Sequence, residues 1–468
     1  MRKDALSEAE LEAALSSVTS PDIRDSDGKR IEWSKLARHL LTEFHVITLS
    51  GVKRELFIHK DGVYINETSC GDAIKKRIHE LAGKEANVAL VKQVIEAIKD
   101  LTSIDRDSIR DDATLINLHN GIFDLRKWCL VPHTPEVIFF SKVPITYSPE
   151  ADCPQIKQFL SEVLSPDMVP VVQELFGYVL YRSYFIKKAF IFVGEGDTGK
   201  STLLSLLCAF LGESNVSGIS LHRLVSDRFA GGTLYQKMAN IYDDLSAKDI
   251  HDNGPFKIVT GGGVLSGEKK FMDHFMFKNF AKLIFACNKI PDIKQADDDA
   301  YFLRWIVIPF SRIIEEDKKD RQLLQRMTTD KELSGLLNYA LEGLQRLLSK
   351  QRFSYEKTTA EIKDEMMRSA STIARFASEM LLEASGEWLT KDDMYHEYTS
   401  YCSRMKIPAA SKQTFGSRLR FSAPYIAEGR PKDPTGAKVQ VTAWRNVKFK
   451  ERDSETTEDD PGDLFGEI

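Results

Sequence analysis

A glycine-rich turn between an apolar strand and an apolar helix constrains the fold of this chain more than any other feature. The segment AFIFVGEGDTGKSTLLSLLCAFLG runs from a buried-strand pattern through the turn into a helical pattern. The turn matches G-x-x-x-x-G-K-[ST], in which backbone N–H groups and a helix N-terminus face phosphate oxygens. Strand and helix patterns then alternate over residues 189–310. This order predicts a mostly parallel sheet covered by helices, with a phosphate site at the turn.

The residues of this turn predict a site for ATP and Mg²⁺. Lys200 is expected to reach the β- and γ-phosphates, and the Ser201 hydroxyl is expected to ligate Mg²⁺. Lys188 precedes the strand and is a candidate to contact the ATP of a neighbouring subunit, although lysines flank many strands. The predicted nucleotide-binding residues are Gly194, Glu195, Gly196, Asp197, Thr198, Gly199, Lys200, Ser201, Thr202 and Lys188.

Two acids follow the next apolar stretch, KMANIYDDLS. We expect Asp243 to coordinate Mg²⁺ and Asp244 to polarise the attacking water, because acids beside a phosphate loop take these roles in phosphoryl transfer. The alternative is a solvated acidic turn without a catalytic role. The phosphate loop upstream favours the catalytic interpretation.

Two further residues are predicted to act in hydrolysis. Asn288 ends the buried strand in KLIFACNKIPD, where its amide would bond the γ-phosphate or the attacking water. The alternative is an ordinary strand-end Asn that caps the next turn. Arg304 is the one basic residue in DDDAYFLRWIVIPF, and in a ring it would reach the neighbour's nucleotide. Its alternative role is a surface salt bridge to Asp297, Asp298 or Asp299.

These blocks, in this order, resemble superfamily 3 helicases of the phage/plasmid primase and poxvirus primase-helicase branch. The matching segments are GEGDTGKST, NIYDDLS, FKIVTGGGVLSGEKKF, LIFACNKIP and AYFLRWIVIPF, with LINLHNGIFDL upstream. The resemblance implies an AAA+-like ATPase, usually a hexameric ring that translocates on DNA. Two positions depart from the pattern: Asp244 stands where relatives often carry Glu, and Leu303 where many carry a second Arg. No paired-acid primase motif is found, and the residues before 55 are too few for a primase domain, so no primase activity is expected.

The expected fold is α/β, with a P-loop AAA+-like core, an α/β N-terminal domain and a C-terminal winged-helix-like domain. The chain has 468 residues, which suggests several domains. The predicted divisions are an N-terminal helical segment (1–54), a primase-helicase-associated domain (55–154), an ATPase domain with a helical collar (155–350), a winged-helix-like domain (375–450) and a disordered acidic tail (451–468).

Two regions are predicted to bind DNA. GEKKFMDHFMFKNF has the alternation of a β-hairpin, and the resemblance implies that such a hairpin enters the ring pore. Its candidate contacts are Lys269, Lys270, Phe271 and His274, through phosphate contacts and base stacking. The basic segment from Arg404 to Lys450 suggests a helix with Arg418 on its exposed side, followed by a turn-rich hairpin. The alternatives are a surface hairpin with ordinary lysines and a basic domain that packs on the ATPase.

Charge and composition set the remaining expectations. The net charge is −5, so any DNA surface must come from local clusters of Lys and Arg. The six cysteines are scattered, and no apolar run is long enough for a signal peptide or a membrane span. We therefore expect a cytoplasmic protein with no membrane partner. The acidic tail ends in Leu464 and Phe465, which suggests docking to a replication protein, masking of the basic face, or an inert tail.

The sequence thus supports two functions. The first is an ATP-dependent, ring-forming DNA helicase, expected to be a homo-hexamer, that acts in replication of a viral, phage or plasmid-like element. The second is an ATP-gated initiator or loader that binds DNA without processive unwinding. The pore hairpin favours the helicase, whereas a basic C-terminal domain fits both.

Overall fold

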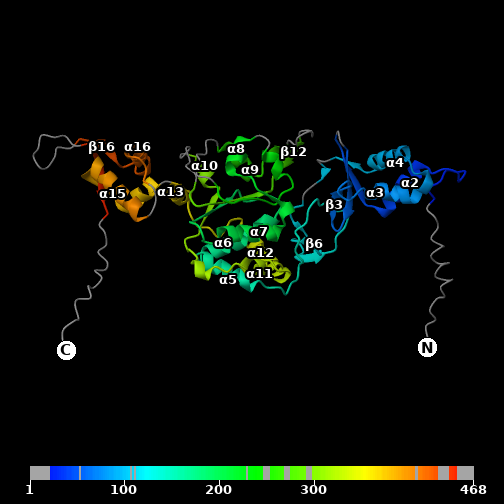
Figure 1. The fold of residues 1–468 in the computed structure, drawn as a ribbon, viewed down its shortest axis with the longest axis horizontal. Coiled ribbons are helices and arrows are strands. Elements are labelled where there is room, and N and C mark those ends of the chain that lie inside the picture. Colours follow the sequence, from blue (N-terminus) through cyan, green and yellow to red (C-terminus); the bar gives the residue numbers. More distant parts are fainter. Residues whose placement is uncertain are drawn as a thin grey trace, which may run out of the picture.

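The computed structural model arranges the chain as three bodies, with the N-terminal and C-terminal bodies on opposite sides of a larger central one (Figure 1). The structure describes residues 22–51, 54–105, 108–109, 112–227, 230–245, 253–267, 275–290, 298–370, 372–405, 409–430 and 442–450. The predicted acidic tail, 451–468, and the hairpin tip with Lys269, Lys270, Phe271 and His274 lie outside them.

The central body is built on a five-stranded sheet in the order β14-β8-β13-β10-β9. All neighbouring strands are parallel, so every strand ends at the same edge of the sheet. This confirms the predicted parallel sheet. The strands are β8 (Ala189–Val193), β9 (Val216–Ser217), β10 (Ala239–Tyr242), β13 (Lys282–Cys287) and β14 (Trp305–Pro309).

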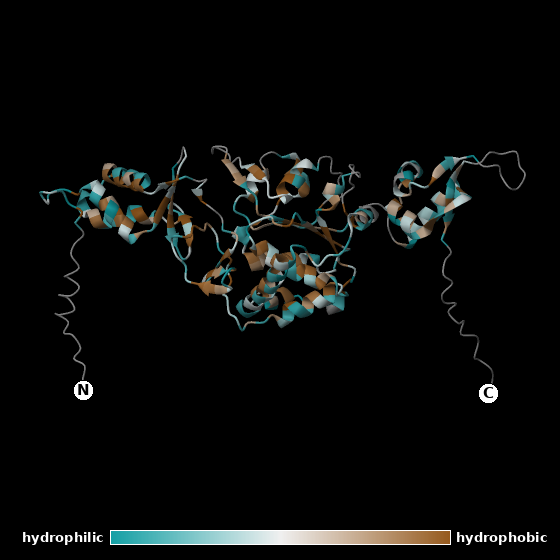
Figure 2. Cartoon of the chain, turned by 180° about the vertical axis from the view of Figure 1, so that it is seen from behind, coloured by the Kyte–Doolittle hydropathy of each residue, from teal (hydrophilic) through white to brown (hydrophobic). Residues whose placement is uncertain are grey.

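Helices cover both faces of this sheet, as Figure 1 shows. One layer contains α5 (Pro154–Val163), α6 (Met168–Leu180), α7 (Lys200–Leu211), α11 (Leu323–Met327) and α12 (Asp330–Lys350). The other contains α8 (Leu221–Ser226), α9 (Gly254–Thr260), α10 (Asp299–Phe302) and α13 (Thr359–Ala370). In Figure 2 hydrophobic residues concentrate on the helix surfaces near the sheet. The antiparallel strands β11 (Val264–Gly267) and β12 (Phe275–Lys278) form the stem of the predicted hairpin.

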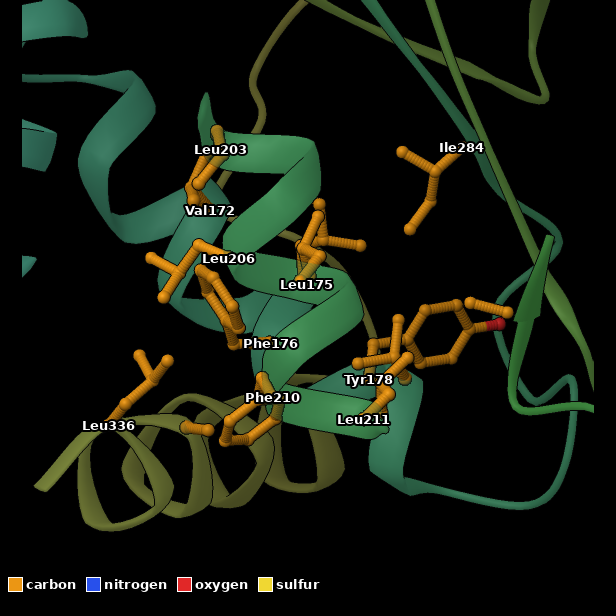
Figure 3. Close-up of a cluster of buried hydrophobic side chains, with 14 of the residues drawn as sticks. Val172, Leu175, Phe176, Tyr178, Leu203, Leu206, Phe210, Leu211, Ile284 and Leu336 are labelled. Atoms are coloured by element: carbon orange, nitrogen blue, oxygen red, sulfur yellow. The ribbon is translucent and has the colours of Figure 1, made fainter. Parts of the chain in front are cut away.

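The core of the first layer lies where α6, α7 and α12 meet (Figure 3). Phe176 of α6 and Phe210 of α7 are fully buried and meet edge to face, with ring centroids 5.3 Å apart. The contact of α6 with α12 is very close, because a Cβ on Gly343 would lie 2.5 Å from the Gln173 carbonyl oxygen. The α6–α12 pair therefore forms a rigid support beneath α7, the helix that follows the phosphate loop.

The N-terminal body contains a four-stranded sheet, β3-β2-β1-β4, with three helices on it. A separate three-stranded sheet, β5-β6-β7, packs Ile116, Leu118 and Phe123 into the core of the central body. β1 pairs with β2, so the four-stranded sheet spans the boundary expected at residue 54. The segment ELFIHKDGVYI, with its Lys-Asp-Gly turn, predicts one hairpin, and TLINLHNGIFDL predicts two short strands around Asn120-Gly121. The pairs β2–β3 and β5–β6 confirm both. The elements are α2 (Trp33–Glu43), β1 (Val46–Leu49), β2 (Glu55–Lys60), β3 (Val63–Asn66), α3 (Ala73–Ala82), α4 (Val88–Leu101), β4 (Ser103–Ile104), β5 (Leu115–Leu118), β6 (Gly121–Asp124) and β7 (Cys129–Val131).

The C-terminal body has its own core around Tyr398, Phe415 and Trp444. Its antiparallel sheet has the order β15-β17-β16. The aromatic-rich segment DDMYHEYTSYCSRM, which the sequence predicts as a helix, forms most of α15. The predicted basic helix is α16, on which Arg418 is exposed. The elements in chain order are α14 (Thr372–Met380), β15 (Leu381–Thr390), α15 (Lys391–Arg404), α16 (Lys412–Ser422), β16 (Ala427–Gly429) and β17 (Ala443–Phe449).

Within the described ranges, every helix is too short or too polar to cross a membrane. All six cysteines are free.

Candidate nucleotide-binding site

The phosphate loop joins the end of β8 to the start of α7, as the sequence predicts. Two of its glycines are required by the space around them. A Cβ on Gly194 would lie 2.2 Å from the Phe310 carbonyl oxygen. Gly199 has a φ of +92°, and a Cβ there would lie 2.9 Å from Cγ1 of Val163. The loop is therefore packed closely between α5 and the segment after β14, and only glycine fits at these positions.

Lys200 lies inside the curve of the loop and is 6% exposed. Its ammonium group donates to the carbonyl oxygens of Gly194 and Glu195, at 2.8 and 2.5 Å, and lies 3.3 Å from Oγ1 of Thr198. Burial lowers the pKa of Lys200, and the carboxylate of Asp243 opposes that shift. The lysine is thus held by the loop backbone, in the place from which it would contact phosphate.

The tip of the loop is fixed by the segment that follows β14. Asp197 has a φ of +61°, and its carbonyl oxygen accepts a bond from the Ile314 N–H at 2.8 Å. Its carboxylate lies 3.0 Å from Nζ of Lys319. Sequence reasoning did not identify Lys319. The available signal was the two acids in the loop, Glu195 and Asp197, which would place negative charge beside bound phosphates and so call for a nearby cation.

The two acids after β10 are both exposed at the carboxyl edge of the sheet. Asp244 has a φ of +56°, and its N–H donates to Oδ1 of Asp243 at 2.9 Å. Ser201 and Asp243 line the same open depression, which has a volume of about 630 Å³. A hydroxyl and a carboxylate that share one depression are suitable oxygen ligands for Mg²⁺. The structure therefore brings together the two residues predicted to bind the metal.

Asn288 directly follows β13 and is exposed at the same edge. β13 lies between β8 and β10 in the sheet, so Asn288 emerges between the phosphate loop and the two acids. The strand order thus places every residue predicted to act on the γ-phosphate from within one chain at a single edge.

Lys188 and Arg304 lie together at the amino-terminal ends of β8 and β14, opposite the carboxyl ends where the phosphate loop begins. Nζ of Lys188 donates to the Leu303 carbonyl oxygen at 2.5 Å, and the Ala189 N–H donates to the Arg304 carbonyl oxygen at 2.7 Å. Five residues of β8 separate them from the phosphate loop, a distance of roughly 16 Å at the usual rise of a strand. Within one chain, neither side chain is placed beside the nucleotide site.

Burial shifts the pKa of both cationic side chains in the same direction. It lowers the pKa of Lys188 to about 8, and it lowers the pKa of Arg304, which Asp298 opposes. Asp298 instead lies 2.9 Å from Nζ of Lys257, while Arg304 donates to the Ala300 carbonyl oxygen. Nε of Arg304 is buried and has no hydrogen-bond partner among the described residues. The guanidinium thus keeps unused donor capacity at this edge.

Two family models match the chain. Residues 22–165 match the family described as "D5 N terminal like", and residues 192–304 match a family of unknown function, DUF5906. The second match contains the phosphate loop, both acids, Asn288 and Arg304. The first match begins before residue 54, which agrees with the sheet that spans the expected boundary there.

Curated viral proteins are similar to part of the chain. "Putative helicase 184R" of Invertebrate iridescent virus 6 is 25% identical over 284 residues, which are 53% of this chain and 28% of that protein. "Putative helicase L207/L206" of Acanthamoeba polyphaga mimivirus is 25% identical over 308 residues, 61% of this chain and 31% of that protein. The chain thus matches less than a third of the length of each. The predicted resemblance to primase-helicases is confirmed by these relatives and by the D5 match.

Among solved structures, the apo form of the NrS-1 C terminal region matches with 15% identity and a TM-score of 0.48, covering 88% of this chain and 98% of that chain. A second apo structure of the same region matches with 16% identity and a TM-score of 0.49.

Proposed function

We propose that this protein is an ATP-dependent DNA helicase that forms a ring and translocates on DNA during replication of a viral, phage or plasmid-like element. The observation that supports this most is the separation of the site into two halves. The phosphate loop, Asp243, Asp244 and Asn288 lie at one edge of the sheet, and Arg304 with Lys188 lies at the other. A complete site then requires two subunits, as in an AAA+-like ring.

Within one subunit the residues divide the work of hydrolysis. Ser201 and Asp243 would hold Mg²⁺, which when bound neutralises charge on the β- and γ-phosphates. Lys200 binds the phosphates once it exchanges the loop carbonyls for phosphate oxygens. Asp244 accepts a hydrogen bond from the attacking water, and the Asn288 amide orients that water or the γ-phosphate.

Arg304 acts on the nucleotide of the neighbouring subunit in this proposal. Its Nε has no hydrogen-bond partner among the described residues, and a guanidinium can donate two parallel hydrogen bonds to a phosphate group. Lys188 lies beside it and adds a second positive group. Because these residues come from another subunit, hydrolysis depends on assembly.

The C-terminal body supplies a DNA contact. Its order of helix, strand, two helices and two strands is that of a winged helix, with α16 as the recognition helix and the β16–β17 connection as the wing. Arg418 is exposed on α16, where it would contact DNA. We also propose that Lys269, Lys270, Phe271 and His274 contact DNA in the pore, at the tip of the hairpin whose stem is β11–β12.

The alternative is an ATP-gated initiator or loader, with which the winged-helix-like body is equally compatible because such a domain also serves factors that only bind DNA. A strand-displacement assay on a forked duplex separates the two functions. The helicase proposal predicts ATP-dependent displacement that Asp244→Asn abolishes. DNA binding and ATP hydrolysis with no displacement at any ring concentration would support the loader instead.

A further inference from the structure

We propose that Leu303 of one subunit docks into a groove beside the phosphate loop of the next subunit and so positions Arg304 at that subunit's nucleotide. This inference rests on the proposed function, because it assumes a ring of copies of this chain. It adds to the ring a specific anchor, Leu303, and the surface that receives it.

The receiving groove is the open depression of about 630 Å³ in which Ser201 and Asp243 lie. It follows one face of α7 as far as Gly212, just past the end of that helix. Exposed carboxylates stand at its two ends, Asp243 beside the phosphate loop and Glu213 after α7. Between them the lining is mostly apolar, with Ser205 as a polar member, and its apolar residues are Leu204, Cys208, Ala209, Ile241 and Leu324.

The anchor has matching features. The Leu303 side chain is 53% exposed, although its neighbour Phe302 is fully buried. Nζ of Lys188 bonds to the Leu303 carbonyl oxygen, and Arg304 follows directly, so an apolar side chain lies among cationic groups. The groove has the complementary arrangement, an apolar lining between two carboxylates. Such complementarity sets the register of a contact and excludes other partners.

Leu303 does not reach the groove of its own chain. It precedes β14, which forms one side edge of the sheet, whereas the groove lies by β10, with β8 and β13 between them. Three strand spacings separate β14 from β10, a distance of roughly 14 Å. The occupant must be a second copy, and contact between two unlike surfaces of identical subunits forms a ring when the rotation between them closes.

The groove contains a native thiol that permits a direct test. Leu303→Cys would place a second thiol within disulfide range of Cys208 in the neighbouring subunit. Cys129 is exposed and is replaced by Ser in all variants. Because burial raises the pKa of Cys208, oxidation with copper–phenanthroline is run at mildly alkaline pH. The matched control is Ile313→Cys. Ile313 is 58% exposed, similar to Leu303, but it follows the carboxyl end of β14, whereas Leu303 precedes its amino end.

We expect Leu303→Cys to form covalent oligomers on a non-reducing gel, and Leu303→Cys with Cys208→Ser to form none. Ile313→Cys should remain at the background level. The inference is overturned if Leu303→Cys subunits assemble and hydrolyse ATP but do not cross-link, or cross-link equally without Cys208. That outcome leaves the helicase proposal standing, whereas absence of ATP hydrolysis in the unmodified protein would contradict the proposed function itself.

A second pair of variants tests the docking of Leu303 without a cross-linking reaction. Leu303→Asp places a charge in an apolar groove between carboxylates, and we expect it to raise the subunit concentration needed for assembly by roughly ten-fold or more. Leu303→Met keeps an apolar side chain of similar volume and should stay within about two-fold of the unmodified protein. Sedimentation velocity across a concentration series measures both. Equal assembly of Leu303→Asp and Leu303→Met would overturn the inference.

Discussion

Lys319 lies where it can offset a negative charge that the phosphate loop itself introduces. Its Nζ is 3.0 Å from the Asp197 carboxylate, in a loop that also carries Glu195. A bound triphosphate brings more negative charge to the same place. We therefore expect Lys319→Ala to weaken ATP binding by about three- to ten-fold, since the carboxylate is then left uncompensated.

The same charge argument predicts a rescue. Asp197→Asn in the Lys319→Ala background should restore the ATP dissociation constant to within about two-fold, because the loop carboxylate that Lys319 compensated is then neutral, whereas Glu316, the other ion-pair partner of Lys319, lies outside the loop. Titration with a fluorescent ATP analogue measures all four proteins of the cycle. If the double variant binds as weakly as Lys319→Ala, Lys319 acts through the shape of the loop and not through charge.

Substitutions of Lys200 and Asp244 should have different effects on ATP binding and hydrolysis. Lys200→Ala removes the cation enclosed by the loop, so we expect loss of both tight ATP binding and hydrolysis. Asp244→Asn keeps the size of the side chain and removes its charge, and should retain ATP binding while hydrolysis falls by about a hundred-fold or more. Binding and single-turnover hydrolysis, measured on the same preparations, distinguish the two. Hydrolysis at the unmodified rate by Asp244→Asn would mean that Asp244 does not polarise the attacking water and that Asp243 serves alone.

At the scale of elements, the α6–α12 contact determines how firmly α7 and its loop are supported. Gly343→Ala would press a Cβ to 2.5 Å from the Gln173 carbonyl oxygen, and backbone atoms cannot move aside cheaply. We expect a destabilisation of about 1–3 kcal/mol. Gly416→Ala is the control, because its Cβ would lie 3.7 Å from Trp444, an ordinary contact, within α16.

Thermal unfolding followed by calorimetry measures both variants. Gly416→Ala should be neutral or slightly stabilising, since Ala favours a helix by up to about 1 kcal/mol over Gly. A Gly343→Ala protein as stable as the unmodified one would show that α6 and α12 can separate without cost, and that the support is not rigid.

Local patterns predicted individual elements well, whereas long-range pairing was not predictable. The β2–β3 hairpin followed from the Asp61-Gly62 turn, whose residues both have positive φ, and the phosphate loop followed from its glycines. The boundary expected at residue 54 divides a sheet, because the pairing of β1 with β2 depends on contacts that no local pattern encodes. Lys319 was missed for the same reason, since it meets Asp197 only after β14 completes the sheet.

At the scale of the whole molecule, the strand order determines which of the predicted site residues lie close together. Asp243, Asp244 and Asn288 were nominated as strand-end polar residues, and parallel pairing brings all three to the phosphate-loop edge. Arg304 was predicted to act across a subunit boundary; it directly precedes β14, away from the phosphate loop of its own chain, and its role remains a prediction. The tip residues of the β11–β12 hairpin and the acidic tail lie outside the described residues, so their predicted roles remain predictions.

The central claim is that each active site combines two subunits, and mixing two inactive variants tests it most directly. Arg304→Ala subunits keep an intact phosphate loop, and Lys200→Ala subunits keep an intact arginine. In randomly mixed rings, about a quarter of the interfaces would pair an intact loop with an intact arginine. We therefore predict that the equimolar mixture regains up to about that fraction of the unmodified ATP hydrolysis rate, while each variant alone stays inactive. Mixed rings, verified by pull-down with two tags, that remain as inactive as the separate variants would contradict the account.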